Sequence, residues 1–390
     1  MRHNLSVGAA LIVLSLSNLA VTGALAPLSA GEIALGGSHS CAVTSNRRVK
    51  CWGYNGVGQL GDGTTTEQHT PVPVKNVRKV QDIAAGGAHT CAAVVRDRTK
   101  CWGYNGYGQL GDGTTTSRKI PVDVTGPAFF AKIAAGYEHT CAINYKDFAT
   151  TVAFCWGRGD VGQLGDGHSL DRFRPSEVEG DPLRILTIAA GHNHSCAVSR
   201  RHQGEDFRAE CWGANGVGQL GDGTTMGANF PQRVRRLVSA FQIAAGSHHT
   251  CALTRSGGGV KCWGHNGFGQ LGDGTNTPRL TPVWVKGLRS GVLAIAAGNG
   301  HSCALMDGGA VKCWGDNSFG KLGDGTTSSR NVPGFVYRLR SGVVAIALGA
   351  SHTCVKIEAG GVKCWGANWN GQLGDGTTLT SHIPVEVEGF

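Results

Sequence analysis

The stretch Cys51-Trp52-Gly53-Tyr54-Asn55-Gly56-Val57-Gly58-Gln59-Leu60-Gly61-Asp62-Gly63-Thr64 decides the fold of this chain. It returns almost unchanged from Cys101 and Cys211, and with small changes from Cys155, Cys262, Cys313 and Cys364. A second recurring phrase precedes each copy, a short isoleucine-led run of small residues that leads into His-Thr-Cys or His-Ser-Cys. Seven copies of one unit therefore account for nearly the whole of the 390 residues.

The spacing of the units predicts the architecture. The units start at Ile33, Ile83, Ile133, Ile188, Ile243, Ile295 and Ile346, so the period is 50 to 55 residues. A period near 50 without helical periodicity is typical of propeller blades. Each unit contains four short strand-like segments, and the last opens with proline, which suits an outer sheet edge because proline cannot donate to a ladder. We predict an all-β, seven-bladed propeller of four-stranded antiparallel blades.

The predicted propeller is a single domain over residues 31–390, with repeats 33–82, 83–132, 133–187, 188–242, 243–294, 295–345 and 346–390. Ahead of it, a positive start, an apolar run and a small-residue region form the tripartite pattern of a secretory signal. We expect a signal peptide at residues 1–30, cleaved near 24–30, and a secreted or extracytoplasmic location of the bacterial type. An uncleaved anchor is the alternative. No other stretch approaches the length of a membrane-spanning helix, so we expect no membrane span in the mature chain.

The 14 cysteines fall as one pair in each unit. If the first hairpin turns at Asn46, Cys41 faces Cys51 within disulfide range. In an exported chain, such regular pairing indicates a disulfide framework. We predict seven bridges: Cys41–Cys51, Cys91–Cys101, Cys141–Cys155, Cys196–Cys211, Cys251–Cys262, Cys303–Cys313 and Cys354–Cys364. The hairpins at 144–154 and 199–210, which are longer and include Phe148, are expected to keep their bridges. Buried free thiols and a zinc site made with His39 are the alternatives, although no fourth zinc ligand recurs.

The remaining repeated residues are expected to serve the fold. The tryptophan after the second cysteine is expected to fill the space between blades, with a sugar-binding platform as the alternative. The aspartate of Asp-Gly-Thr is expected to close an Asx-type turn, because a single carboxylate is too few for a calcium loop. The histidine that precedes the first cysteine is expected to hold a loop by bonding to backbone. We therefore expect no metal site.

The sequence lacks the motifs of the common enzyme classes. It has no paired carboxylates for hydrolysis, no Gly-x-Ser-x-Gly elbow and no phosphate-binding Gly-Lys-Ser/Thr loop. The net charge of +9 is spread without a block of five like charges. No aromatic and basic residues interleave in a groove-like run, so we expect a solvated basic rim and no nucleic-acid partner. We expect no enzyme and no cofactor.

The combined phrase Ile-Ala-Ala-Gly-x-x-His-Thr-Cys-Ala, Cys-Trp-Gly-x-Asn-x-x-Gly-Gln-Leu-Gly-Asp-Gly-Thr and Pro-x-x-Val resembles the regulator of chromosome condensation repeat over residues 31–390. The resemblance implies a seven-bladed propeller. It also implies functions found among its members: guanine nucleotide exchange on a small GTPase, scaffolds of ubiquitin ligases, and secreted bacterial propellers that inhibit β-lactamases. No exchange residue maps onto this chain. Eukaryotic members commonly build one blade from both chain ends. Here either whole blades meet by packing, or Pro384–Phe390 pairs with the strand at Ile33.

Any activity is expected in the residues that differ between copies. We expect a monomeric scaffold that binds a protein partner through one face of the ring. The candidate contact residues are Tyr54, Tyr104, Tyr107, Arg158, His265, Phe268, Phe319 and Trp369. The alternatives are guanine nucleotide exchange, as in the nuclear members, and carbohydrate or cell-wall binding through exposed aromatic side chains, for which Trp369 is the leading candidate.

Overall fold

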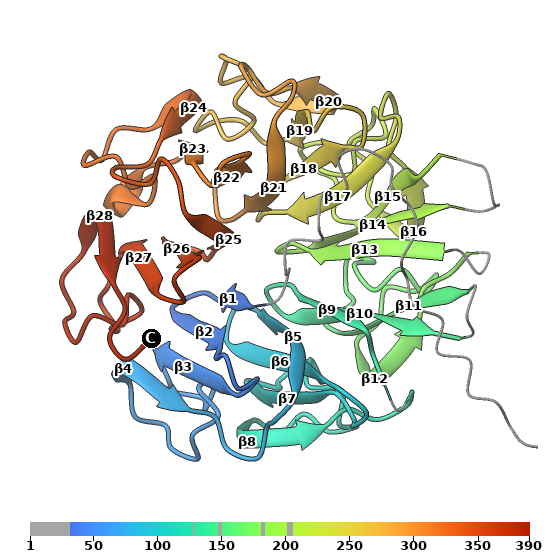
Figure 1. The fold of residues 1–390 in the computed structure, drawn as a ribbon. Coiled ribbons are helices and arrows are strands. Elements are labelled where there is room, and N and C mark those ends of the chain that lie inside the picture. The colour runs from blue at the N-terminus through green and yellow to red at the C-terminus, as the bar shows by residue number, and fades with distance from the viewer. Residues whose placement is uncertain (1–31, 128, 147–149, 181–183, 201–205) are drawn as a thin grey trace, which may run out of the picture.

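Seven four-stranded sheets form a ring (Figure 1), which confirms the predicted propeller. The structure is a computed structural model and describes residues 32–127, 129–146, 150–180, 184–200 and 206–390. Within each sheet the strands pair antiparallel in chain order, from the axis of the ring outward. The predicted signal peptide at residues 1–30 and Phe148 lie outside the described residues.

The four strands of each blade occupy the same places in every repeat. The innermost strands are β1 (Ile33–Leu35), β5 (Val80–Ala85), β9 (Lys132–Ala135), β13 (Arg184–Ala190), β17 (Ala240–Ala245), β21 (Val292–Ala297) and β25 (Val343–Leu348). The second strands are β2 (His39–Val43), β6 (His89–Val94), β10 (His139–Tyr145), β14 (His194–Arg200), β18 (His249–Thr254), β22 (His301–Met306) and β26 (His352–Ile357).

The outer half of each blade is equally regular. The third strands are β3 (Val49–Gly53), β7 (Lys100–Gly103), β11 (Thr151–Gly157), β15 (Arg208–Gly213), β19 (Val260–Gly264), β23 (Val311–Gly315) and β27 (Val362–Gly366). The outer strands are β4 (Gln68–Pro73), β8 (Arg118–Asp123), β12 (Arg172–Glu177), β16 (Ala228–Arg233), β20 (Arg279–Trp284), β24 (Arg330–Phe335) and β28 (Ser381–Glu386). A single 3₁₀ turn, η1 (Ser318–Gly320), interrupts the strands of the described chain, which contains no helix long and apolar enough to cross a membrane.

Small residues let the inner strands converge on the axis. A Cβ added to Gly86 would lie 2.3 Å from the carbonyl oxygen of Gly136 in the next blade, so only glycine fits there. The inner turns are joined by backbone hydrogen bonds from blade to blade, for example Gly37 N to Gly87 O at 3.1 Å. The last of these runs from Ala350 N to Gly36 O and closes the circle. Together the turns line an axial cavity of about 380 Å³.

The prolines of the outer strands lie inside the strand rather than at its start. In the first blade, Val72 pairs with Cys51 and Gln68 pairs with Gly53. Three residues of β4, including Pro71, therefore lie opposite the single residue Trp52. Because proline has no N–H to donate, such a bulge on an edge strand accommodates it without losing a ladder bond. The prediction that proline opens the strand was therefore wrong in position, although the outer-edge assignment was right.

The ring closes by the packing of whole blades. β1 pairs with β2, and β28 pairs with β27, so no strand is exchanged between the two chain ends. The seam is held by side chains: the indole N–H of Trp52 donates to the carbonyl of Gln372 at 2.9 Å, and Lys50 Nζ donates to the carbonyl of Gly389 at 2.9 Å. The sequence leaves two closures open, the packing of whole blades and the pairing of Pro384–Phe390 with the strand at Ile33. The structure shows the packing of whole blades.

Different connections form the two faces of the ring. The turns between first and second strands and the glycine-rich loops between third and fourth strands form one face, called the loop face. Tyr54 N donates to Ser38 O at 2.9 Å and joins these two connections. The hairpins between second and third strands and the linkers to the next blade form the opposite face, called the hairpin face. There, Val80 N donates to Arg47 O at 3.1 Å.

Candidate functional site

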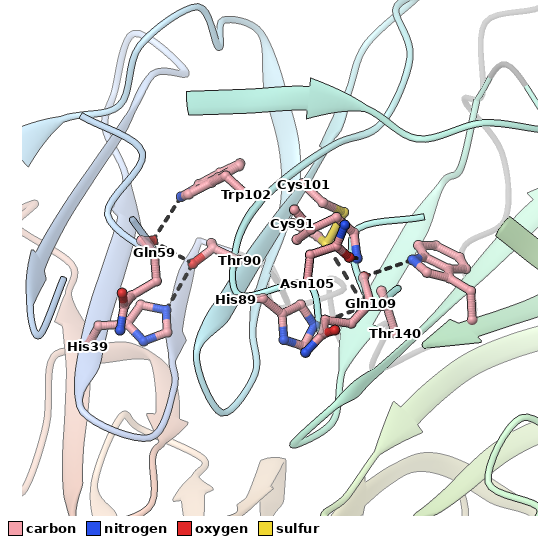
Figure 2. Close-up of a disulfide and its surroundings, with 12 residues drawn as sticks. His39, Gln59, His89, Thr90, Cys91, Cys101, Trp102, Asn105, Gln109 and Thr140 are labelled. Atoms are coloured by element: carbon pink, nitrogen blue, oxygen red, sulfur yellow. Dashed lines mark hydrogen bonds between the residues drawn. A yellow bond between two sulfur atoms is a disulfide. The ribbon is translucent and has the colours of Figure 1, made fainter. Parts of the chain in front are cut away.

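Three hydrogen bonds hold each blade junction, and Figure 2 shows the first set. His39 Nε2 lies 2.8 Å from the Thr90 hydroxyl of the next blade. That hydroxyl donates to the carbonyl of Gln59 at 3.0 Å, and the indole of Trp102 donates to the same carbonyl at 2.8 Å. Because the Thr90 hydrogen points to Gln59, its oxygen is left to accept the N–H of His39.

The same arrangement occurs at every junction and closes on itself. The successive pairs are His39–Thr90, His89–Thr140, His139–Ser195, His194–Thr250, His249–Ser302, His301–Thr353 and His352–Ser40. The expectation that the histidine holds a loop by bonding to backbone was therefore wrong, because its partner is a side-chain hydroxyl. The imidazole of each histidine instead reaches across the blade junction and lies at hydrogen-bond distance from a hydroxyl of the next blade.

Burial keeps these histidines neutral. It lowers the pKa of His39 to about 4, and that of His89 and His249 to about 3. The charge of neighbouring histidines makes a smaller contribution to the last two of these values. A neutral imidazole with one donated hydrogen bond suits a structural role. The same residues are fully buried in the wall between blades, away from any surface that a substrate could reach.

The predicted disulfides are present in all seven hairpins. Cys41 is the direct cross-strand partner of Cys51, and Val43 is the partner of Val49, as the turn at Asn46 predicts. The two longer hairpins keep the same opposed pair. The zinc alternative is wrong because the sulfur atoms are bonded to each other, and the described part of the chain has no cluster of three metal-ligating side chains.

The Asp-Gly-Thr segment closes a turn, as expected. The Asp62 carboxylate accepts the Thr64 N–H at 2.9 Å. Asn55 fixes the rest of the loop, because its amide donates to Asp62 and to the carbonyl of Thr66, and its oxygen accepts the N–H of Leu60. The repeated loop is therefore a rigid platform, and the residues that vary on it have fixed positions.

The eight candidate contact residues all lie on these loops, between the third and fourth strands of their blades. Tyr54, Phe268, Phe319 and Trp369 are exposed, and Trp369 has the largest exposed fraction of the four at 54%. Phe319 and Trp369 come from adjacent blades and meet edge to face, with ring centroids 4.6 Å apart. Three further contacts join candidates: Tyr104–Tyr107, His265–Phe268 and Arg158 over Tyr107.

Blade three departs from the repeated loop. Gly159 stands where the other loops have asparagine. Its N–H donates to the carboxylate of Asp171 at 2.9 Å. Arg158 forms ion pairs with Glu138 and Asp160, both at 2.7 Å. The guanidinium is therefore held in one orientation on the loop face beside Tyr107.

A ring stack on the inner turns was not predicted. Tyr137 stacks on His192 at a centroid distance of 4.2 Å, and His192 stacks on His248 at 5.8 Å. Tyr137 and His192 also line the axial cavity. The sequence places the three residues at the two variable positions of the Gly-x-x-His turn. Comparing these positions between copies could have found the stack.

The loop of blade six contains a buried ion pair. Lys321 stands where the other blades have glutamine, and its Nζ lies 2.6 Å from Asp316 and 2.8 Å from the carbonyl of Asn299. Burial lowers the pKa of Lys321, and the bond to Asp316 opposes this. Burial also opposes ionisation of Asp316, but hydrogen bonds from Lys321 and Ser318 hold its pKa below the ordinary value. The pair fixes the loop that presents Phe319.

Comparison with known proteins places the chain among RCC1-repeat proteins. The regulator of chromosome condensation (RCC1) repeat matches residues 48–93, 101–143, 152–198, 211–253, 258–305 and 309–355. The ultraviolet-B receptor UVR8 of Arabidopsis thaliana is 34% identical over 239 residues, which are 60% of this chain and 53% of the receptor. The probable E3 ubiquitin-protein ligase HERC4 of Homo sapiens is 36% identical over 213 residues, 53% of this chain and 20% of the ligase. The chain thus spans about half or less of these relatives.

Solved structures share the fold. Yeast RCC1 (Prp20), in its crystal structure with Kap60, has a TM-score of 0.74 at 20% identity and covers 87% of this chain and 83% of its own. Human WBSCR16 has a TM-score of 0.75 at 21% identity, over 87% of this chain and 93% of its own. With repeats matched over most of its length, this chain belongs to the regulator of chromosome condensation (RCC1) repeat family.

Proposed function

We propose that the chain is an exported, non-catalytic scaffold that binds a protein partner through its loop face. The observation that carries this proposal is the group of exposed aromatic side chains on one face, presented by glycine-rich loops of different blades. Trp and Tyr, with Arg, are enriched among the residues that dominate protein–protein binding energy. Arg158 and Tyr107, which lie 5.1 Å apart, supply such a pair on blades two and three.

Rigidity supports this role. The loop asparagine, the junction hydrogen bonds and the disulfides fix the backbone that carries these side chains. A preorganised surface loses little conformational entropy on binding, so more of the contact energy appears as affinity. The relatives are consistent with protein binding, since yeast Prp20 is described with Kap60 and for its binding to Gsp1p and histones.

Export is supported by the cysteines. All 14 are paired, and disulfides of this density persist in oxidising compartments. The test is to fractionate the producing cell and to measure the mass of the exported chain after alkylation, with and without reduction. We expect a chain shortened by about the predicted signal, with every thiol protected until reduction. An intact chain in the cytoplasm with reactive thiols would contradict the proposal.

The binding test uses aromatic residues of the two faces. The double variant Phe319→Ala/Trp369→Ala removes the edge-to-face pair of the loop face, whereas Tyr337→Ala removes an exposed ring (43%) from the hairpin face. With a partner captured by cross-linking from the surroundings of the producing cell, we expect the double variant to bind roughly tenfold or more weakly. The Tyr337 variant should bind as the parent does. Equal loss in both variants, or in neither, would contradict a loop-face site.

Carbohydrate binding is a second candidate because Trp369 is half exposed and packs against Phe319, an arrangement that resembles an aromatic platform. A glycan array distinguishes the two. Glycan binding that is lost in Trp369→Ala would replace the protein partner with a sugar, whereas an array without signal favours the protein. Nucleotide exchange, the third candidate, predicts accelerated GDP release from a small GTPase, which the same purified chain can be tested for directly.

A further inference from the structure

Five basic residues of the hairpin face have a left-handed backbone. They are Arg47 (φ 57°), Lys79 (φ 56°), Arg96 (φ 56°), Arg236 (φ 57°) and Arg338 (φ 53°). This region is unfavourable for residues that carry a Cβ and is the ordinary place of glycine. The five lie in hairpin turns or linkers of four different blades, and all are exposed.

Other blades place glycine at the corresponding positions. Arg47 lies two residues before Val49, and Gly309 lies two residues before Val311 at the same place in blade six. Arg96 lies three residues before Thr99, which is the residue of blade two at the place of these valines, and so corresponds to Gly308. In the linkers, Lys79 corresponds to Gly291, and both Arg236 and Arg338 correspond to Gly287. The repeat therefore offers a less strained residue at each place. Asn76 (φ 57°) and Ser239 (φ 54°) also have a left-handed backbone at two of the linker places, but most of the non-glycine residues at these places are cations. Such a substitution is costly for the fold and so points to a role outside it.

A basic hollow lies between the first two blades on this face. It has a volume of about 710 Å³ and is lined by Arg48, Lys75, Arg78, Lys79 and Arg96, with Asp97 as the one carboxylate. Among the residues that the structure describes, Lys100 is the only cation within ion-pairing distance of Asp97, at 4.0 Å. The cations that line the hollow, of which only Lys79 and Arg96 have a left-handed backbone, have no carboxylate partner in the described chain. Their charges are therefore free to meet an anion.

The loop face is different. Its arginines pair with carboxylates of the same loops: Arg118 with Asp112, Arg172 with Asp166, Arg279 with Asp273, and Arg330 with Asp324. Arg158 pairs with Glu138 and Asp160. These charges cancel locally, so much of the net charge of +9 is expressed on the hairpin face. The two faces are therefore suited to different partners.

We propose that the hairpin face docks on the surface of an anionic phospholipid membrane, with a headgroup phosphate in the hollow between blades one and two. The left-handed cations come from blades around the ring rather than from one groove, which fits an extended planar partner better than a single strand of nucleic acid. Two exposed apolar side chains flank them, Val238 (71% exposed) beside Arg236 and Tyr337 (43% exposed) beside Arg338. Amphipathic rings and basic side chains together are typical of membrane-surface contacts.

The test measures sedimentation of the full oxidised chain with vesicles of phosphatidylcholine, with and without about 30 mol % phosphatidylglycerol. We expect binding only to the anionic vesicles, and we expect raising the salt from about 0.05 M to about 0.5 M to reverse it. The decisive variant replaces all five left-handed cations with the residue of the other blades: Arg47→Gly, Lys79→Gly, Arg96→Gly, Arg236→Gly and Arg338→Gly. Each of these charges contributes to attraction at the membrane surface, so binding should fall roughly a hundredfold or more.

This variant also separates binding from folding. Because glycine relieves the left-handed backbone, the quintuple variant should melt at the same temperature as the parent or higher. A second variant with Lys at Arg47, Arg96, Arg236 and Arg338 keeps the charges and should retain binding. A matched pair on other parts of the surface, Lys119→Gln/Arg174→Gln, removes exposed cations outside the hairpin face and should have little effect.

Three outcomes would overturn the proposal. The first is parent binding that does not distinguish neutral from anionic vesicles. The second is full vesicle binding by the quintuple glycine variant. The third is tighter binding to duplex DNA than to anionic vesicles with the same dependence on the five cations, which would assign the face to nucleic acid. The parent and all variants are compared in the same exported form, so any contribution from residues 1–30 is the same in each.

Discussion

One hydroxyl has two roles at each blade junction. The oxygen of Thr90 accepts the imidazole N–H of His39, and its hydrogen is donated to the carbonyl of Gln59. Thr90 is fully buried, as is His39, so neither group can turn to water for a replacement partner. A buried donor left unsatisfied costs about 1–3 kcal/mol. The junction hydroxyl therefore contributes more to the stability of the ring than an exposed hydroxyl would.

We predict that Thr90→Val lowers the free energy of unfolding by about 1–3 kcal/mol, because it leaves the His39 N–H without an acceptor while nearly conserving volume. Urea titration followed by tryptophan fluorescence measures the change. Thr65→Val is the matched control, since Thr65 lies exposed on the loop of the preceding repeat and should change stability by less than about 0.5 kcal/mol. Equal effects in the two variants would show that the junction hydroxyl is dispensable.

The hairpin with its disulfide is the element on which each blade depends. Cys251 and Cys262 are opposed residues of β18 and β19, and both are buried. The bridge joins two residues that are 11 positions apart in the sequence. In the chain-entropy description, closing a loop of this size restricts the unfolded chain and stabilises the fold by roughly 3 kcal/mol. The glycine-rich loop that follows β19 starts from this fixed hairpin.

We predict that Cys251→Ala/Cys262→Ala lowers the free energy of unfolding by roughly 2–3 kcal/mol in oxidising buffer. Urea unfolding monitored by circular dichroism measures it. In strongly reducing buffer the parent loses the same bridge, so the difference between parent and variant should largely disappear. A difference that persists unchanged after complete reduction would assign the loss to packing of the sulfur atoms rather than to the bridge.

The circle of seven buried histidines is a property of the whole molecule. Burial holds the pKa of His139, His194 and His352 at about 3, against an ordinary value of 6.5. Below pH 6.5 the unfolded chain binds protons that the folded ring cannot accept, so the free energy of unfolding falls as the pH drops from about 6.5 towards 3. Asp82 changes the free energy of unfolding in the opposite direction. Burial raises its pKa to about 7, so as the pH falls the folded chain binds this proton at a higher pH than the unfolded chain does.

We predict that the net effect is a loss of stability in mild acid, since several histidines oppose one aspartate. One unit of pKa difference corresponds to about 1.4 kcal/mol, so the loss of stability grows with each buried histidine that the unfolded chain protonates. Urea midpoints measured between about pH 7.5 and pH 4.5 should fall steadily with pH. Midpoints that stay constant down to pH 4.5 would contradict the role assigned to the histidines.

Two features could be predicted from the repeated unit without knowing how the units pack together. The Cys41–Cys51 pairing follows from hairpin register alone, because both residues and the turn between them lie within one short segment. The burial of Trp102 follows from a large ring at the same place in every unit. The partner of His39 could not be found in this way. Its hydroxyl acceptor is 51 residues away, in a motif where every histidine already has a serine or threonine next to it.

The sequence by itself therefore determined the seven blades, their four strands and their disulfides, because these depend on local patterns that repeat along the chain. Only the tertiary structure decided how neighbouring blades meet. It showed the circle of histidines, the closure between Trp52 and Gln372, the contact of Arg158 with Tyr107 across two blades, and the basic hollow on the hairpin face. The physical reason is that each of these depends on the angle and offset between repeats, which result from the packing of complete blades around the axis.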